Sequence, residues 1–247
     1  MEKLISGDSL KPKEQNELLS ARNWEQNDLF RITLLKLSSQ DISNSTMRYF
    51  CKEITDRFLH ILACEKDNSI VILENLTHEK QHIEKDHQRF MEFIREGNFR
   101  AASSNPFYGL TNISSYIKEA NITLEYGNKE KNTAWHQKFN DHALSYFIDK
   151  GTEEIDAERI CAEEIRILQK YDKENDTQLC RTLRCYLRNK ENASKTAKEL
   201  FIQRGTLLYR LSRIEKLAGI RFDNYEQILF LHLSFHILDR ITKADTF

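Results

Sequence analysis

The first spacing in the chain that could do chemistry is a pair of histidines one helical turn apart. His78 and His82 flank Glu79 in the pattern His-Glu-x-x-His, which puts two imidazoles and a carboxylate on one helix face, as in zinc hydrolases. Charged residues surround the motif, so we expect no apolar wall to exclude water from a catalytic zinc. Lys85 and Gln88 also stand where one class of zinc proteases has glycine and a third histidine. A zinc-dependent hydrolase is therefore an alternative hypothesis only, and no metal site is predicted.

Other patterns typical of enzymes do not occur in the sequence. It contains no phosphate-binding loop, dinucleotide fingerprint or nucleophile elbow. His232 and His236 are also one turn apart, but on an apolar stretch where packing histidines are more common than ligands. The five cysteines are scattered without a Cys-x-x-Cys pair, so neither a disulfide framework nor a zinc knuckle is expected. We predict a protein that is not an enzyme and has no cofactor.

Polar and basic side chains in the last third of the chain have the types and spacing needed to bind DNA. A glutamine can pair with adenine, and an arginine with guanine, through two hydrogen bonds at the base edges. We expect residues 203–206 to reach the bases, while Tyr209, Arg210 and Arg213 hold the phosphate backbone. The full set of predicted DNA contacts is Ser194, Lys195, Gln203, Arg204, Gly205, Thr206, Tyr209, Arg210 and Arg213.

Two helices joined by a tight turn must position these side chains. Ser194 is a suitable N-cap for a first helix over 194–200, and Ala197 is small enough for a second helix to cross it closely. The second helix, over 203–218, has an apolar stripe at helical spacing. This stripe consists of Leu207, Leu211, Ile214 and Ala218. Because a recognition helix must be apolar behind and polar in front, the pattern predicts a helix-turn-helix.

Charge is distributed unevenly along the chain. Residues 176–222 contain eleven basic and four acidic side chains, a net charge of about +7, although the whole chain carries −1. The remainder is therefore acidic, at about −8. A basic module joined to an acidic domain fits nucleic-acid binding. A solvated basic helix face explains the charge equally well when the charge is taken alone.

Length and composition indicate two helix-rich domains. The 247 residues exceed one typical domain, 40% of them are hydrophobic, and glycine and proline are few. No segment resembles a signal peptide or is long and apolar enough to span a membrane. We therefore expect a cytoplasmic protein without a membrane partner.

Upstream of residue 140 the pattern alternates between strands and helices. Residues 1–27 are polar and unpatterned, as in a leader or a short helix. From residue 29 the predicted order is strand, helix, hairpin, helix, strand, helix, strand, with Gly127 ending the last helix. A hairpin pairs antiparallel, so an α+β layer is expected rather than a doubly wound fold. The strands are expected at 29–37, 60–64, 70–73, 99–103 and 135–139, and the helices between them at 44–59, 77–96 and 111–126.

Everything after residue 140 reads as helical. The predicted helices are 141–149, 153–172, 176–189, 194–200, 203–218 and 224–241. The change of class near Lys150-Gly151 gives the domain boundary. The predicted domains are a leader over 1–27, an α+β domain over 28–150, and a helical domain over 151–247 with its helix-turn-helix core at 176–222.

The C-terminal segment resembles the helix-turn-helix of the PucR family of bacterial transcription regulators, which includes the sugar-diacid regulators. Its most specific part is the run Arg-x-Thr-Leu-x-Tyr-Arg-Leu over 204–211. Gln203 stands where the family commonly has His, and Gly205 where it commonly has Asn, so the operator sequence does not carry over. The matching stretches are Leu183–Leu187, Asn192–Leu200, Arg204–Glu215 and Gly219-Ile220.

The resemblance also implies a fold for the preceding domain. In that family it is often a degenerate relative of the nucleotide-cyclase (GGDEF-like, ferredoxin-like) fold, and the element order over 29–139 is similar. Active cyclases carry a Gly-Gly-Asp/Glu-Glu-Phe signature at the hairpin, where this chain reads Cys64-Glu65-Lys66-Asp67-Asn68-Ser69. The glycines and the paired acids for metal are absent, so a structural or dimerising domain without cyclase activity is expected.

The sequence therefore predicts a sequence-specific, DNA-binding transcription regulator, an activator by resemblance. Double-stranded operator DNA is the expected partner, bound by a homodimer whose two recognition helices meet two half-sites, with RNA polymerase as a further partner. A weakly specific architectural DNA-binding protein is the second alternative, besides the zinc hydrolase.

Overall fold

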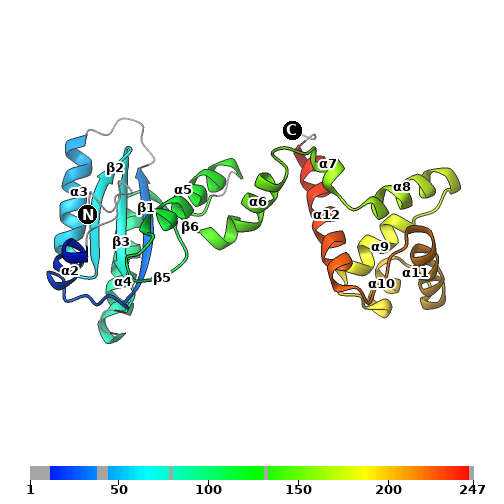
Figure 1. Cartoon of the computed structure of the whole chain (residues 1–247), viewed down its shortest axis with the longest axis horizontal. Coiled ribbons are helices and arrows are strands. Elements are labelled where there is room, and N and C mark those ends of the chain that lie inside the picture. The colour runs from blue at the N-terminus through cyan, green and yellow to red at the C-terminus, as the bar shows by residue number, and fades with distance from the viewer. Residues whose placement is uncertain (1–11, 38–43, 78–79, 131–132, 245–247) are drawn as a thin grey trace. The chain divides into compact units, whose positions relative to one another are not determined.

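The computed structural model describes residues 12–37, 44–77, 80–130 and 133–244. The chain divides into two compact units, residues 1–147 and 148–247, each with its own hydrophobic core (Figure 1). The division falls within α6 (Phe139–Gly151). Among the described residues, no helix is long and apolar enough to cross a membrane.

The N-terminal unit is built on one mixed sheet. Its strands are β1 (Leu29–Leu37), β2 (Ile61–Lys66), β3 (Ser69–Asn75), β4 (Phe99–Ser103), β5 (Phe107–Tyr108) and β6 (His136–Lys138). Their order is β2-β3-β1-β4-β6, with β5 also paired to β1. All pairs are antiparallel except β4 with β6, which is parallel. β1 therefore lies at the centre of the sheet.

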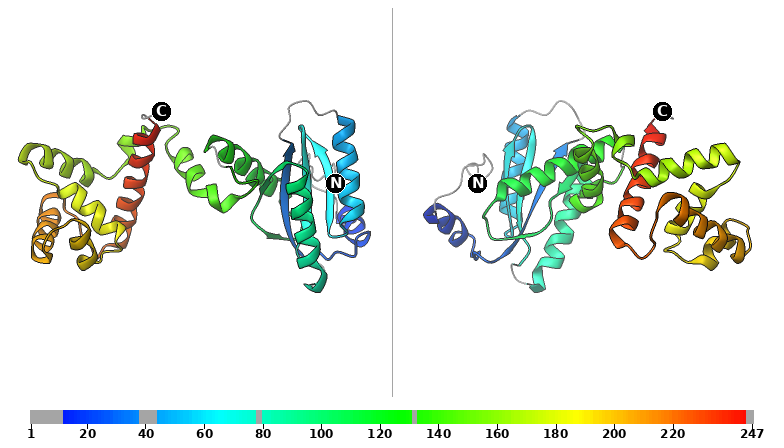
Figure 2. Two further views of the ribbon diagram at one scale, coloured as in Figure 1. Left: turned by 180° about the vertical axis from the view of Figure 1, so that it is seen from behind. Right: turned by 45° about the vertical axis from the view of Figure 1, so that its right-hand side comes forward.

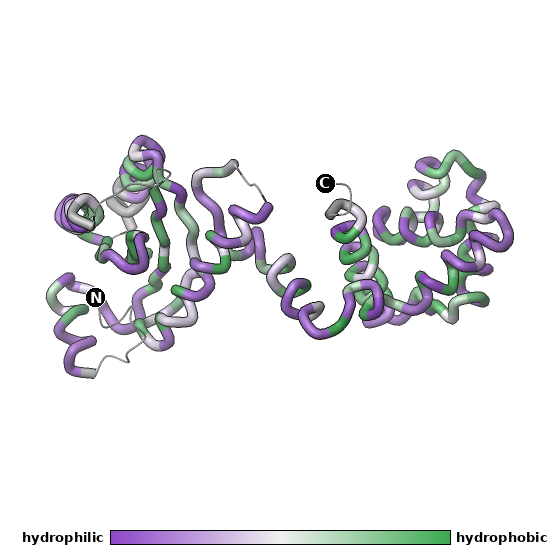
Figure 3. Tube along the Cα trace, turned by 90° about the horizontal axis from the view of Figure 1, so that it is seen from above, coloured by the Kyte–Doolittle hydropathy of each residue, from purple (hydrophilic) through white to green (hydrophobic). Residues whose placement is uncertain are grey.

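Helices cover both faces of this sheet (Figure 2). The helices are α2 (Pro12–Ser20), α3 (Asn44–Arg57), α4 (Lys80–Glu96) and α5 (Ile113–Lys129). Because side chains alternate along a strand, Phe30, Ile32 and Leu34 of β1 face α2 and α5, whereas Leu35 faces α3 and α4. Figure 3 shows hydrophobic stretches along the strands, where these two apolar layers meet the sheet.

The predicted α+β element order is confirmed in this unit. The strand over 29–37, the hairpin and the strand over 99–103 all occur where the sequence places them. The hairpin turns at Asp67 and Asn68, whose φ values of 48° and 57° give a turn that matches the twist of two paired strands. His78 and Glu79 of the zinc motif, and the side chain of His82, lie outside the described residues.

The prediction that Gly127 ends a helix is wrong. α5 continues through this residue to Lys129, and Gly127 is buried. A Cβ at position 127 would lie 1.5 Å from Gln137 Oε1. The glycine therefore leaves room for the Gln137 side chain, whose Oε1 lies 3.0 Å from His142 Nε2.

Of the two alternatives for residues 1–27, a leader or a short helix, the structure shows the short helix in the segment that follows residue 11. That segment forms α2 and a turn, and Leu19 and Trp24 are buried in the core beneath the sheet. The Trp24 ring lies 5.5 Å from the ring of Phe30, centroid to centroid. The sequence pattern misses this because only two apolar side chains of the segment are buried.

A charged network is enclosed on the face of the sheet that carries α4. Glu74 on β3 is fully buried. Its Oε2 accepts a hydrogen bond from Arg31 Nη2 at 2.6 Å, and its Oε1 lies 2.7 Å from His87 Nδ1. Burial alone would raise the pKa of Glu74, but His87 and Arg31 outweigh it and lower the pKa to about 2. The ionised carboxylate thus joins β1, β3 and α4.

A second polar group lies on the same face of the sheet and runs across β1, β4 and β6. Thr33 Oγ1 lies 2.8 Å from Ser103 Oγ, which lies 2.8 Å from His136 Nε2. Burial lowers the pKa of His136 to about 4, and the charges of Arg31 and Lys138 add to the effect. The folded chain therefore holds His136 neutral at every pH above about 4.

The C-terminal unit is helical, as predicted. Its helices are α7 (Ala157–Ile160), α8 (Glu163–Asn175), α9 (Leu179–Arg188), α10 (Ala193–Glu199), α11 (Arg204–Ala218) and α12 (Tyr225–Ala244). The single helix expected over 153–172 is wrong, because α7 and α8 are separate and meet at Cys161-Ala162. The N–H of Ala162 donates to Ser234 Oγ at 2.9 Å, which fixes this corner to α12.

Lowering the pH should destabilise the N-terminal unit through His136. In the unfolded chain its pKa is near 6.5, so between pH 6.5 and 4 the unfolded state binds a proton that the folded state does not. The free energy of unfolding should fall across this window by up to about 1.4 kcal/mol per pH unit. Urea denaturation of the full chain at several pH values should show a shallower fall for His136→Gln. Equal slopes in the two proteins would contradict this account.

Candidate nucleic-acid interface

Asp172, near the end of α8, fixes the start of α9. Its Oδ1 accepts hydrogen bonds from the Thr177 hydroxyl at 2.5 Å and from the Leu179 N–H at 2.7 Å. Its Oδ2 accepts one from the Cys180 N–H at 2.8 Å. The residue before α9, Gln178, makes no side-chain capping bond, so Asp172 caps the helix from another element. This joins the two helices that support the recognition helix.

Asn192, and not Ser194 as predicted, is the N-cap of α10. Its Oδ1 accepts a hydrogen bond from the Lys195 N–H at 2.9 Å. The cap lies two residues earlier than expected because Lys190 and Glu191 both adopt positive φ and turn the chain immediately after α9. Ser194 and Lys195 are then exposed on the first turn of α10.

The turn between α10 and α11 is closed by two backbone hydrogen bonds. The Phe201 N–H donates to Lys198 O at 3.2 Å, and the Ile202 N–H donates to Ala197 O at 3.0 Å. These are the two bonds of the motif that commonly ends helices, in which the residue with positive φ is usually glycine. Here it is Phe201, with φ of 54°. An L-residue in this conformation costs roughly 1–2 kcal/mol.

The apolar stripe of α11 is buried, as predicted. Leu207, Leu211 and Ile214 are in the core with Leu183 of α9 and Leu168 of α8. Partly buried Leu200, Ile202 and Ala218 pack around them. Gly219 ends the helix in the left-handed conformation, with φ of 67°. This packing fixes α11 by its back, so its front is free for a partner.

The structure exposes the four residues predicted to read bases. Gln203, Arg204, Gly205 and Thr206 form the entry and first turn of α11, and all four are exposed. Space around Gly205 is open, since an added Cβ would meet no atom within 4 Å. The N-terminal turn also has free backbone N–H groups directed along the helix axis, which attract phosphate. Tyr209, one turn further on, is 65% exposed.

Arg210 and Arg213 are instead directed toward the supporting helices. Arg210 Nη1 donates to Thr182 Oγ1 of α9 at 3.1 Å. Arg213 donates to the Tyr171 hydroxyl, and its guanidinium carbon lies 5.0 Å from the centre of that ring on α8. Both arginines are half-buried. In the structure they tie α11 to α9 and α8, which the sequence pattern does not reveal.

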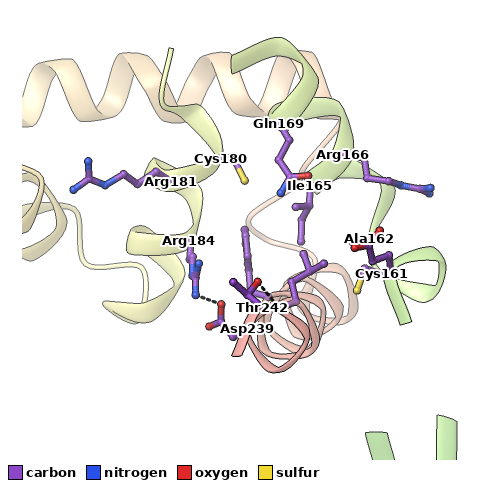
Figure 4. Close-up of a pocket in the computed structure, with 13 residues that line it drawn as sticks. Cys161, Ala162, Ile165, Arg166, Gln169, Cys180, Arg181, Arg184, Asp239 and Thr242 are labelled. Carbon is purple, nitrogen blue, oxygen red and sulfur yellow. Dashed lines mark hydrogen bonds and ion pairs between the residues drawn. The ribbon is translucent and has the colours of Figure 1, made fainter. Parts of the chain in front are cut away.

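A cavity of about 480 Å³ lies in the same unit between α8, α9 and α12 (Figure 4). Cys180 and Gln169 are directed into it, whereas Arg166 and Arg181 are directed away. Arg184 and Asp239, which also line it, form an ion pair with each other. Burial raises the pKa of the Cys180 thiol to about 11. The Cys180 thiol is therefore protonated at neutral pH.

The fold and the exposed end of α11 define a helix-turn-helix DNA-binding module. The family model of the PucR C-terminal helix-turn-helix domain matches residues 179–237, from α9 into α12. Residues 179–237 are therefore a PucR-type helix-turn-helix domain, and the resemblance drawn from the sequence is confirmed.

Curated relatives of the chain are bacterial proteins of greater length. The carbohydrate diacid regulator of Escherichia coli K12 is 29% identical over 139 residues, 56% of this chain and 35% of that protein. The proline-responsive transcriptional activator PutR of Bacillus subtilis is 22% identical over 216 residues, 81% of this chain and 50% of that protein. YsfB of Bacillus subtilis is 33% identical over 66 residues, 27% of this chain and 18% of that protein. The chain thus spans half or less of each of these relatives.

One solved structure aligns along most of the chain. It is the regulator of polyketide synthase expression from Bifidobacterium adolescentis, with 16% sequence identity and a TM-score of 0.42 over 96% of this chain and 89% of that chain.

Replacing Asp172 with alanine should loosen the support of the recognition helix. The substitution removes three hydrogen bonds and the cap of α9, so the free energy of unfolding of the C-terminal unit should fall by about 1–2 kcal/mol. Urea denaturation of the full chain followed by circular dichroism measures this. Glu174→Ala is the control, because Glu174 is exposed and its ion pair with Lys170 spans 4.0 Å at the surface. Equal effects of the two substitutions would contradict the capping role.

Proposed function

We propose that the protein is a sequence-specific transcription regulator that inserts the N-terminal turn of α11 into the major groove of DNA. The observation that carries the proposal is the exposed stretch Gln203–Thr206 at the start of a helix whose back is buried, within a PucR-type domain. Gln203 and Arg204 are the side chains with the hydrogen-bonding groups to read bases. Ser194 and Lys195, on the first turn of α10, would hold phosphates.

The arginines of the second half of α11 take a different role in this proposal. Arg210 and Arg213 position the helix through Thr182 and Tyr171, and they present their remaining N–H groups to the phosphate backbone beside it. Tyr209, exposed on the same helix next to Arg213, contacts the same strand of DNA. Loss of Arg210 therefore removes both a helix support and a cation, whereas loss of Arg204 removes only a DNA contact.

Dimerisation and activation extend the proposal. A homodimer would present two recognition helices to two half-sites about one helical turn of DNA apart. PutR is described as an activator, and by analogy we assign activation, through contact with RNA polymerase, to this chain. A regulator of this kind acts in the cytoplasm, without a cofactor and without catalysis.

For the N-terminal unit we propose a degenerate nucleotide-cyclase-like domain. The support is the order of strands and helices around the β2–β3 hairpin, together with the sequence of the hairpin itself. Lys66-Asp67-Asn68-Ser69 has neither the glycine pair that lets backbone approach a phosphate nor the paired acids that bind metal. The unit then serves as a structural or dimerising part, not as an enzyme.

The proposal predicts specific DNA binding that depends on Arg204. A binding site selected from a pool of random duplexes should be held by the full chain at physiological salt against excess unrelated DNA. Arg204→Ala should weaken this binding by about 10–100-fold, the loss expected for one bidentate base contact. Fluorescence anisotropy with a labelled duplex measures the dissociation constants.

Arg159→Ala provides the matched control, because Arg159 is an exposed arginine of the same unit on α7, away from the α10–α11 turn in sequence. It should leave the affinity unchanged. Selection that enriches no sequence would favour a weakly specific architectural protein. Stoichiometric zinc that is lost in His78→Ala would favour the hydrolase instead.

A further inference from the structure

The turn between α10 and α11 contains a phenylalanine that the fold does not use. The Phe201 side chain is 96% exposed, the highest value among the exposed large hydrophobic side chains of the described residues. It belongs to neither the core of the unit nor its partly buried surroundings. Packing within the chain therefore gives no reason for an aromatic residue at this position.

The backbone of Phe201 also disfavours this residue type. Its φ of 54° is at the helix-ending position where glycine is the unstrained choice. The chain thus keeps a strained and exposed aromatic residue where glycine would fold more easily. Strained residues of this kind are enriched at functional sites.

The surroundings of Phe201 indicate the binding partner. The residue lies two positions before Gln203, at the entry of α11, so it is continuous with the proposed base-reading surface. Lys198 and Arg204, the nearest cations on either side in sequence, are both exposed. An aromatic ring between two exposed cations suits the edge of a nucleic acid, where anionic phosphates alternate with apolar sugars and thymine methyl groups.

We propose that Phe201 is a DNA contact and packs its ring against apolar carbon atoms at the wall of the major groove. The inference rests on the proposed function and deepens it. The two hydrogen bonds of the turn already hold the backbone of Phe201 fixed, so binding has to order only the side-chain torsions of the ring. The flanking cations contribute affinity through counterion release, whereas the affinity contributed by the ring does not depend on it.

The test is Phe201→Gly in the full chain, with two readouts that should change in opposite directions. Glycine relieves the positive-φ strain, so the midpoint of thermal unfolding should rise by about 2–4 °C. Removal of the ring should weaken binding to the selected duplex by about tenfold. Phe201→Ala, which keeps the strain and loses the ring, should show the same loss of affinity without the gain in stability.

Two comparisons identify the nature of the contact. The slope of log Kd against log salt should be unchanged in Phe201→Gly and reduced by about one in Lys198→Ala. Duplexes with deoxyuridine in place of thymine distinguish the two carbon sources. If a thymine methyl is the partner, the deoxyuridine duplex should weaken DNA binding by the wild-type chain but not by Phe201→Gly. If deoxyribose is the partner, the deoxyuridine duplex should leave the DNA affinity of both proteins unchanged.

Tyr225→Ala is the control for removal of an exposed aromatic side chain, because Tyr225 is 76% exposed at the start of α12. It should leave DNA affinity unchanged. Undiminished affinity of Phe201→Gly, with affinity lost in Arg204→Ala, would overturn the role of Phe201 and leave the proposed function standing. Failure of the wild-type chain to hold any selected duplex would overturn both.

Discussion

The burial of one face of α11 is the constraint on which the proposed interface depends. Leu207, Leu211 and Ile214 are held in a core built by α8, α9, α10 and α12. Burying each side chain of this size contributes about 1.5–3 kcal/mol, which fixes the rotation of α11 about its axis. That rotation determines which side chains are exposed at its N-terminal turn. The side-chain bonds of Arg210 and Arg213 and the cap provided by Asp172 add directional restraints to this apolar anchor.

The two units use carboxylates with several hydrogen-bond donors for related structural purposes. In the N-terminal unit, Glu74 joins two strands and a helix through Arg31 and His87. In the C-terminal unit, Asp172 joins α8 to α9 through backbone N–H groups. In both places a carboxylate accepts from several donors, so its removal leaves these donors without that partner. The apolar cores supply most of the stability, and these groups specify how neighbouring elements meet.

Local signals in the sequence were sufficient for much of this structure. The alternation over 29–37, the turn residues of the hairpin and the stripe of α11 each depend on spacing within one element, and each was predicted. The errors came from tertiary contacts. The sequence predicts that Gly127 ends a helix, yet this glycine is buried against Gln137 within the helix. The sequence also predicts Ser194 as the N-cap, but the chain turns earlier and Asn192 caps the helix. The hydrogen bonds of Arg210 and Arg213 depend on side chains of neighbouring helices. The strain at Phe201 depends on its φ. The sequence carries no local signal for either.

Hydrogen–deuterium exchange of the full chain, with and without its selected duplex, tests the central claim most directly. The account predicts that DNA slows amide exchange in the peptides covering 192–213, from the cap of α10 through the exposed half of α11. The samples with and without DNA should be compared at a chain concentration that gives the same oligomeric state in both. Under this condition, DNA should leave amide exchange in the strands of the N-terminal unit unchanged. Protection concentrated outside 192–213, with none at the N-terminal turn of α11, would contradict the recognition role assigned to this helix.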